Sequence, residues 1–233
     1  MYINLKPQFF FKTLVIIIIL LLIANIFSIA TKLNFILDYD NQKIVRGISD
    51  KFDFDTEKSI PTMFSSIILF FSAVLLGILG IKDRKDRAKY SPWFGLSAIF
   101  VFLSIDEMIE IHEHLIPIIK MIKPTSGVFY YAWIIPYGIG LIILSLVYYK
   151  FLMRLPKKTL YLFMLSGFIF ILGAVVIESF EGWEHQLNGK RTLTFCLMYT
   201  AEETLEMLGV SLFIYAILSY SSFSVKIESK TSI

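Results

Sequence analysis

Two stretches of the chain carry the same acidic motif, and their residue types are ones that bind metal ions. Residues 107–114 read Glu-Met-Ile-Glu-Ile-His-Glu-His, and residues 178–185 read Glu-Ser-Phe-Glu-Gly-Trp-Glu-His. Both fit the pattern E-x-x-E-x-x-E-H. A third acidic run, at 202–206, reads Glu-Glu-Thr-Leu-Glu and echoes the spacing within 106–110. Carboxylates together with imidazoles suit Fe, Mn or Zn better than copper(I), which prefers sulfur ligands.

Helical periodicity predicts that these side chains gather on common faces. At about 100° per residue, Glu107, Glu110 and His114 fall on one side of a helix, and the second motif behaves in the same way. The predicted metal ligands are the side chains on these faces: Glu107, Glu110, His114, Glu178, Glu181, His185, Glu202, Glu203 and Glu206. Asp106 and Glu113, at the edge of the face, are the predicted catalytic residues, because a carboxylate beside a metal could move protons. His112 is expected to point elsewhere.

The chain around these motifs is typical of an integral membrane protein. It has 233 residues, of which 56% are hydrophobic and 18% are charged, whereas soluble domains have about 25% charged residues. The apolar residues form six blocks, each near the roughly 20 residues that a helix needs to cross a bilayer. The blocks run about 13–30, 61–81, 92–118, 128–149, 159–182 and 195–220. We therefore expect an all-α bundle of six transmembrane helices, with residues 1–233 in a single transmembrane domain and a loop at 31–60.

Basic residues set the expected orientation in the membrane. The loops at 82–91 and 150–158 together hold nine Lys and Arg residues, and short loops rich in Lys and Arg stay in the cytoplasm. Both termini are then cytoplasmic, in a bacterial inner membrane, and the acidic motifs lie in the outer half. The first block has a basic flank like that of a signal peptide, but its long apolar run favours a retained anchor.

Charge inside these blocks is costly and needs a compensating partner. Ten of the 19 acidic residues and all three histidines fall in three blocks or at their outer ends. Each charge near the centre of a membrane helix costs about 2.5–3.5 kcal/mol. Lys and Arg are confined to loops and block edges, so the carboxylates must be paired with one another, protonated, hydrated or bound to metal. We expect one or two ions of Fe, Mn or Zn.

The spacing of the two motifs suggests an internal repeat. A shift of 71 residues, from 107 to 178, also places the second and third apolar blocks on the fourth and fifth. Duplicated units around a shared central site occur in other membrane proteins. The sequence therefore predicts a duplicated helical hairpin.

Two resemblances rest on these residues. The ligand inventory is similar to that of the di-metal carboxylate proteins, which combine single glutamates with Glu/His pairs on helices of a bundle. The Glu/His pairs are four residues apart in this chain and three apart in those proteins. The segments 52–55 with 60–66, 103–107 with 112–113, and 202–207 resemble multi-pass bacterial membrane proteins with no assigned activity. This second resemblance implies a bacterial origin and no mechanism.

Three weaker features have ordinary explanations. Asp53, Asp55 and Glu57 alternate as in a calcium loop but lack its glycine and distal glutamate, so we expect a solvated acidic turn. Tyr and Trp residues near the block ends, Tyr131 and Trp133 among them, are typical of an interfacial belt. The single cysteine, Cys196, has no disulfide partner in the chain and is expected to pack.

Three functions fit these observations. The first is a membrane-embedded metalloenzyme that acts on a lipid or quinone-like substrate, and the second is a divalent-cation or proton-coupled transporter or channel. The third is a non-catalytic structural or sensor protein. The inner parts of the blocks offer few polar groups for conduction, which favours the enzyme. The chain has no phosphate-binding loop or nucleic-acid-binding surface, so membrane lipids are the expected partners.

Overall fold

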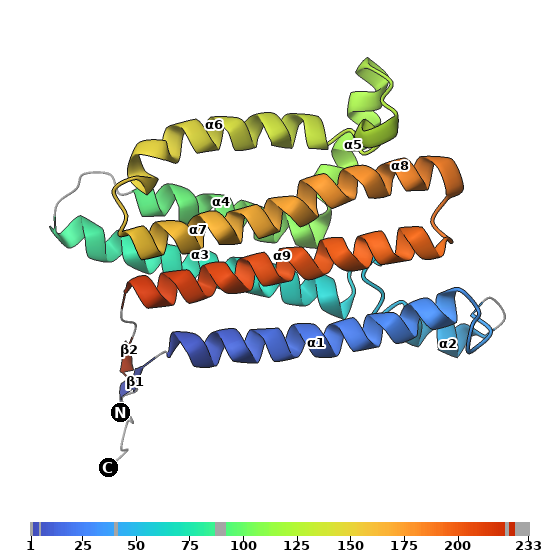
Figure 1. Ribbon diagram of the computed structural model, residues 1–233, viewed down its shortest axis with the longest axis horizontal. Coiled ribbons are helices and arrows are strands. Elements are labelled where there is room, and N and C mark those ends of the chain that lie inside the picture. Colours follow the sequence, from blue (N-terminus) through green and yellow to red (C-terminus); the bar gives the residue numbers. More distant parts are fainter. Residues whose placement is uncertain (1, 5, 40–41, 87–91, 222–223, 227–233) are drawn as a thin grey trace, which may run out of the picture.

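The computed structural model describes residues 2–4, 6–39, 42–86, 92–221 and 224–226, most of which are helical (Figure 1). The α-helices are α1 (Pro7–Lys32), α2 (Lys43–Ser49), α3 (Ile60–Asp86), α4 (Pro92–Ile109), α5 (Ile111–Ile122), α6 (Ile134–Leu152), α7 (Lys157–Ile171), α8 (Glu178–Asn188) and α9 (Leu193–Tyr220). The shorter elements are a 3-10 helix η1 (Gly127–Phe129), a π-helix η2 (Leu172–Ile177) and two strands, β1 (Tyr2–Asn4) and β2 (Ser224–Lys226).

Five segments are long and apolar enough to cross a membrane. They are Pro7–Lys32, Ile60–Asp83, Pro92–Ile109, Ile134–Leu152 and Lys157–Asn188. The described part of the chain is therefore all-helical apart from its two short strands, and its five apolar helices are consistent with a membrane protein. Helix α9 has 28 residues but is not among the five segments. It contains three glutamates within five residues, and the predicted sixth span is not confirmed.

Helix α9 forms the centre of the bundle. It packs against α1, α3 and α7, and its side chains Phe195, Met207, Ile214 and Ile217 have no exposed surface. Gly209 permits a close approach to α7, because a Cβ at this position would be 2.8 Å from the Phe170 backbone nitrogen. Small residues at helix contacts serve the same purpose in other membrane proteins.

Helix α6 stands apart from the rest of the bundle (Figure 1). Its contacts are at its ends: the Tyr137 hydroxyl donates to Asp106 Oδ2 over 2.9 Å, and the Tyr148 hydroxyl donates to the Pro92 carbonyl over 3.1 Å. By contrast, α3 and α4 pack side by side. The helices of the first predicted hairpin, α3 and α4, pack against each other, whereas α6 and α7 of the second do not pack in the same way. The structure therefore does not support the predicted duplication.

The third predicted block, 92–118, is broken at Glu110. This residue has left-handed backbone angles (φ 59°, ψ 43°), so α4 ends before it and α5 begins after it. The Asp106 carboxylate accepts a hydrogen bond from the His112 amide N–H over 2.9 Å. This bond satisfies an amide of the first turn of α5, which has no hydrogen-bond acceptor within that helix. The prediction that Glu107, Glu110 and His114 share one helical face is therefore wrong, because the helix does not continue through them.

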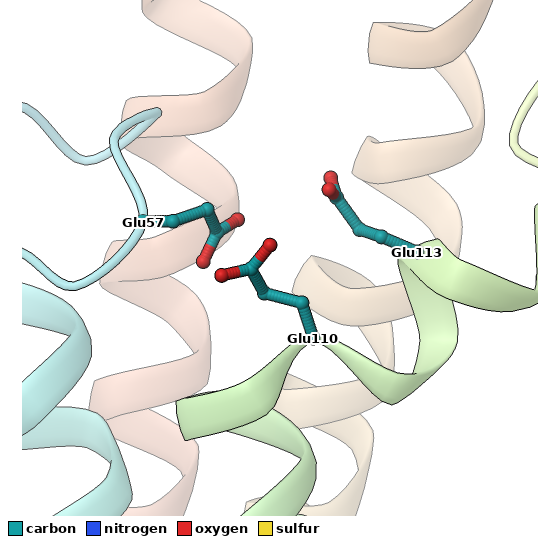
Figure 2. A group of neighbouring side chains, drawn as sticks. All are labelled: Glu57, Glu110 and Glu113. Carbon is teal, nitrogen blue, oxygen red and sulfur yellow. The ribbon is translucent and has the colours of Figure 1, made fainter.

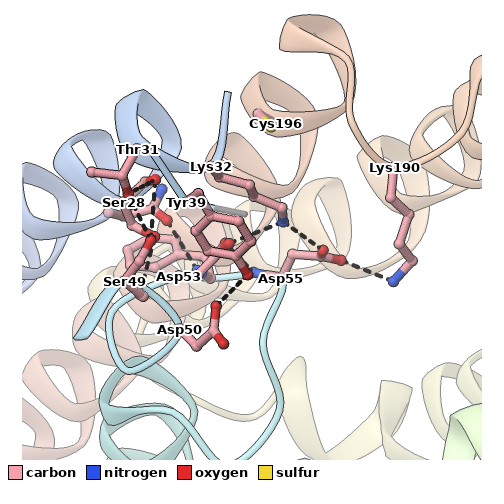
Figure 3. A network of polar contacts seen from close by, with 12 residues as sticks. Ser28, Thr31, Lys32, Tyr39, Ser49, Asp50, Asp53, Asp55, Lys190 and Cys196 are labelled. Carbon is pink, nitrogen blue, oxygen red and sulfur yellow. Dashed lines mark hydrogen bonds and ion pairs between the residues drawn. The ribbon is translucent and has the colours of Figure 1, made fainter. Parts of the chain in front are cut away.

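The loop between α1 and α3 is fastened to the bundle by ion pairs (Figure 3). Lys32 Nζ lies 2.9 Å from Asp53 Oδ2 and 2.9 Å from Asp55 Oδ2, and Lys190 Nζ lies 3.0 Å from Asp55 Oδ1. Asp53 is 1% exposed. The prediction of a solvated acidic turn is wrong, because Lys32 at the end of α1 draws both aspartates onto the bundle.

The two ends of the chain meet at one end of the molecule. Strands β1 and β2 pair antiparallel, with Tyr2 opposite Lys226 and Asn4 opposite Ser224. The three acidic motifs lie toward the opposite end, near the connections α4–α5 and α8–α9 (Figure 1). Both termini therefore lie on the side away from the acidic residues.

Candidate metal centre

A cavity of about 810 Å³ gathers the acidic side chains of three distant segments. The glutamates of α4, α8 and α9 that line it form what we call the inner cluster: Glu107, Glu178, Glu181, Glu202, Glu203 and Glu206. All six are among the ligands predicted from the sequence. The structure thus brings together most of the predicted ligands. However, α4 ends before Glu110, so the first motif does not lie on one continuous helix as predicted.

The π-helix η2 sets the direction of the second motif. It ends immediately before Glu178, the first residue of α8. A π-helix turn has an extra residue relative to an α-helix and often occurs at functional sites. Gly173, within η2, lies so close to α9 that an added Cβ would be 2.7 Å from the Glu202 backbone oxygen. This approach holds the carboxylates of α8 against those of α9.

Carboxyl groups of the inner cluster are close neighbours. The Glu202 carboxyl interacts with those of Glu178 and Glu181. Ionised carboxylates only accept hydrogen bonds, so these contacts need a proton or a cation between the oxygens. In addition, Oε2 of Glu181 and Oε2 of Glu203 are buried, and no hydrogen-bond donor of the described residues reaches them. Buried oxygens without a donor are typical of sites that hold an ion or a water molecule.

Two aromatic residues before α6 orient the inner cluster. Trp133 Nε1 donates to Glu178 Oε1 over 2.8 Å, and the Tyr131 hydroxyl donates to Glu181 Oε1 over 3.3 Å. Gly182 lets Tyr131 lie against α8, because an added Cβ would be 2.8 Å from the tyrosine ring. The sequence pattern places both aromatics in an interfacial belt and does not predict these hydrogen bonds. Their roles as donors could have been suspected only from their position between the two acidic motifs.

His112, which was expected to point away, is the histidine that lines the cavity. Its Nδ1 lies 3.2 Å from Asp106 Oδ1, and its ring packs 5.1 Å from that of Trp133. Burial lowers the pKa of His112, but the hydrogen bond with Asp106 and the charges of Glu178 and Asp106 outweigh burial and raise it to about 9. His112 therefore carries a positive charge at neutral pH and faces the inner cluster as a counterion.

A second group of carboxylates comes from the loop before α3 and from the turn between α4 and α5 with the start of α5 (Figure 2). We call Glu57, Glu110 and Glu113 the outer cluster, and each offers an oxygen within 4.8 Å of the others, so that together they could hold a metal ion. Partial burial and the charges of Glu113 and Glu110 raise the pKa of Glu57 to about 7. The left-handed turn at Glu110 thus moves this predicted ligand into a different group, where it meets Glu57, a residue that the sequence pattern had missed.

The structure does not bring the two predicted histidine ligands into the inner cluster. His114 is exposed, and its Nδ1 donates to the Glu110 carbonyl over 2.6 Å. His185 lies among aromatic rings, with Nδ1 3.0 Å from the Tyr131 hydroxyl. The Tyr131 hydroxyl therefore lies between the side chains of His185 and Glu181.

Gly173 should tolerate no side chain. We expect Gly173→Leu to lower the free energy of unfolding by about 1–3 kcal/mol, because the new side chain overpacks the contact with α9. Unfolding in mixed detergent micelles measures this effect. Gly167→Leu in α7 is the matched control, since an added Cβ there meets nothing within 4 Å. Equal stability of the two variants would contradict the close contact between η2 and α9.

Comparison with known proteins places this chain in a family without assigning it an activity. The family model described as "Domain of unknown function (DUF8692)" matches residues 13–220, which include both clusters and all five apolar segments except the first residues of the one that begins at Pro7. No curated protein and no solved structure matches the chain. Since the match covers most of its length, the chain belongs to the DUF8692 family.

Proposed function

We propose that this protein is a membrane-embedded metalloenzyme that binds one or two divalent ions of Fe, Mn or Zn. The observation that carries the proposal is the charge of the cavity. Ten acidic residues line it: Asp55, Glu57, Asp106, Glu107, Glu113, Glu178, Glu181, Glu202, Glu203 and Glu206. The cationic side chains among the described lining residues are Lys190 and His112. Two divalent cations would offset about half of the remaining negative charge.

The inner cluster provides the ligands for this proposal. Carboxylate oxygens suit hard and borderline ions, and Glu181 and Glu203 each direct an oxygen without a donor into the buried site. A bound ion would act as a Lewis acid or activate a water molecule. Asp106 is the proposed proton carrier, because it receives hydrogen bonds from both His112 and Tyr137 at the edge of the cluster.

A transporter of divalent cations or protons is the second candidate. The two acidic clusters favour it, since an ion could pass from the outer cluster to the inner one. The rest of the cavity argues against a transporter. Its lining away from the inner cluster is largely apolar and includes Leu141, Leu144, Phe163 and Phe213. A pocket with one polar end fits an enzyme better than a conduction path.

Elemental analysis of the purified full-length protein tests the proposal. We expect one to two equivalents of Fe, Mn or Zn after purification without chelators, and renewed binding after a chelator has removed them. If the purified protein carries no metal and takes up none of the three ions, the proposal of a metalloenzyme is wrong. The inner cluster would then be a protonated carboxylate network, and proton or cation transfer would become the leading function.

For the membrane topology, we propose that α9 is a sixth crossing and that both termini are cytoplasmic. At about 1.5 Å per residue, a 28-residue helix is long enough to cross a bilayer, and the pairing of β1 with β2 requires an even number of crossings. In intact cells, Asn188→Cys should react with an impermeant thiol reagent, whereas Arg154→Cys should not. Both positions are exposed, and Cys196 is buried and adds little background. The opposite labelling pattern would invert the topology.

A further inference from the structure

The acidic cavity continues into an apolar chamber between three membrane-spanning helices. Its walls come from α4, α6 and α7, and they include Phe102, Leu103, Leu141, Leu144, Met164 and Phe168. The inner cluster forms the polar end of the same cavity. One continuous space therefore joins a carboxylate site to an apolar interior.

The middle of this chamber is open rather than filled by side chains. Gly140 of α6 and Gly167 of α7 both line it, and an added Cβ at either position would meet nothing within 4 Å. Helix α6 is fastened near its ends by the hydroxyls of Tyr137 and Tyr148, while its central part stands away from the bundle (Figure 1). The chamber is partly open, and α6 forms one of its walls.

We propose that the chamber holds the hydrocarbon chain of a membrane lipid, with the polar group of that lipid at the inner cluster. This inference rests on the proposed function and names its substrate class. The volume of about 810 Å³ lies within the range of about 300–1,000 Å³ that is usual for small-molecule sites.

The surroundings of the chamber favour a lipid chain over a protein segment. Helix α6 lies within a membrane-spanning segment, and its outward side chains Ile142 and Leu146 are more than 60% exposed, so the solvent at the opening is hydrocarbon. A second helix would need a gap of about 10 Å along its whole length. The hydroxyl contacts of Tyr137 and Tyr148 hold α6 close to α4 at both ends, which leaves room for a flexible chain only.

Photo-cross-linking tests this proposal directly. The full-length protein is reconstituted in vesicles of phosphatidylethanolamine and phosphatidylglycerol that contain a phosphatidylethanolamine with a diazirine in the middle of one acyl chain. After irradiation, mass spectrometry locates the adducts. We expect adducts on the chamber residues Leu141, Leu144 and Met164 as well as on the outward Ile142 and Leu146, which serve as an internal reference for ordinary membrane contact.

Filling the chamber supplies the decisive comparison. Gly140→Phe with Gly167→Phe should reduce adducts on the chamber residues to background while leaving those on Ile142 and Leu146 unchanged. Gly138→Phe is the matched control, because Gly138 lies in the same helix and is also open to a Cβ but does not line the cavity. Unlabelled chamber residues in the unsubstituted protein, or labelling that survives filling, would overturn the proposal. Chain labelling needs no metal, so the metal content of the same samples tests the proposed function separately.

Discussion

Replacing Glu203 and Glu206 together by glutamine should weaken the binding of Mn(II) or Zn(II) at least about a hundredfold, since the loss of a mere supporting contact already costs 10- to 100-fold. Both side chains come from α9 and line the cavity beside Glu107 and Glu178. Glutamine preserves the shape of glutamate and removes its negative charge. Equilibrium dialysis against buffered metal measures the change in affinity.

Two control variants separate the inner cluster from acidic or histidine residues in general. His114→Ala should leave the affinity unchanged, because His114 is exposed and does not line the cavity. Glu184→Gln should behave in the same way, since the Glu184 carboxylate is already engaged by Asn188 and Thr192. Full binding by the Glu203/Glu206 double variant would move the metal site away from α9 and leave the outer cluster as the remaining candidate.

Replacing Lys32 by methionine should cause the largest loss of stability, about 3–5 kcal/mol, the usual cost of removing one partner from a buried ion pair. Lys32 holds both Asp53 and Asp55, and Asp53 has no other charged partner among the described ion pairs (Figure 3). Asp55 retains Lys190. Thermal or denaturant unfolding in micelles measures the effect.

Two further variants test this explanation. Lys58→Met should change stability little, because Lys58 is 77% exposed and lies 3.9 Å from Glu110, and such exposed pairs contribute about 0–1 kcal/mol. Adding Asp53→Asn to Lys32→Met should restore part of the lost stability, since the unpaired buried charge is then removed. If the double variant is no more stable than Lys32→Met alone, the effect would come from packing of the lysine side chain rather than from charge.

The convergence of α4, α8 and α9 could be predicted because it depends on hydropathy and spacing. Apolar blocks determine where helices lie, and acidic residues at matching depths must share a site in a medium that tolerates few charges. This reasoning found all six residues of the inner cluster. It also identified the five segments that are long and apolar enough to cross a membrane, whereas the sixth predicted span, α9, is not among them.

The histidines could not be assigned correctly because a single backbone angle decides their positions. A continuous helix through Glu110 would carry His114 to the same face as Glu107. The left-handed turn, which the sequence does not signal with a glycine or proline, instead directs His112 toward Asp106. Glu57 was missed for a related reason: its position depends on the tertiary contacts of the loop, which periodicity does not describe.

The ion pairs around Asp55 also imply an order of events during synthesis. Lys32 precedes Asp55 by only 23 residues, whereas Lys190 follows it by 135. At about 5–20 residues per second, the ribosome needs about 7–27 seconds to make the intervening chain. The nascent loop can therefore pack on α1 early, through Lys32, but its contact with Lys190 can form only after the connection between α8 and α9 has been synthesised. Full attachment of the loop to the bundle is consequently a late step in the biogenesis of this protein.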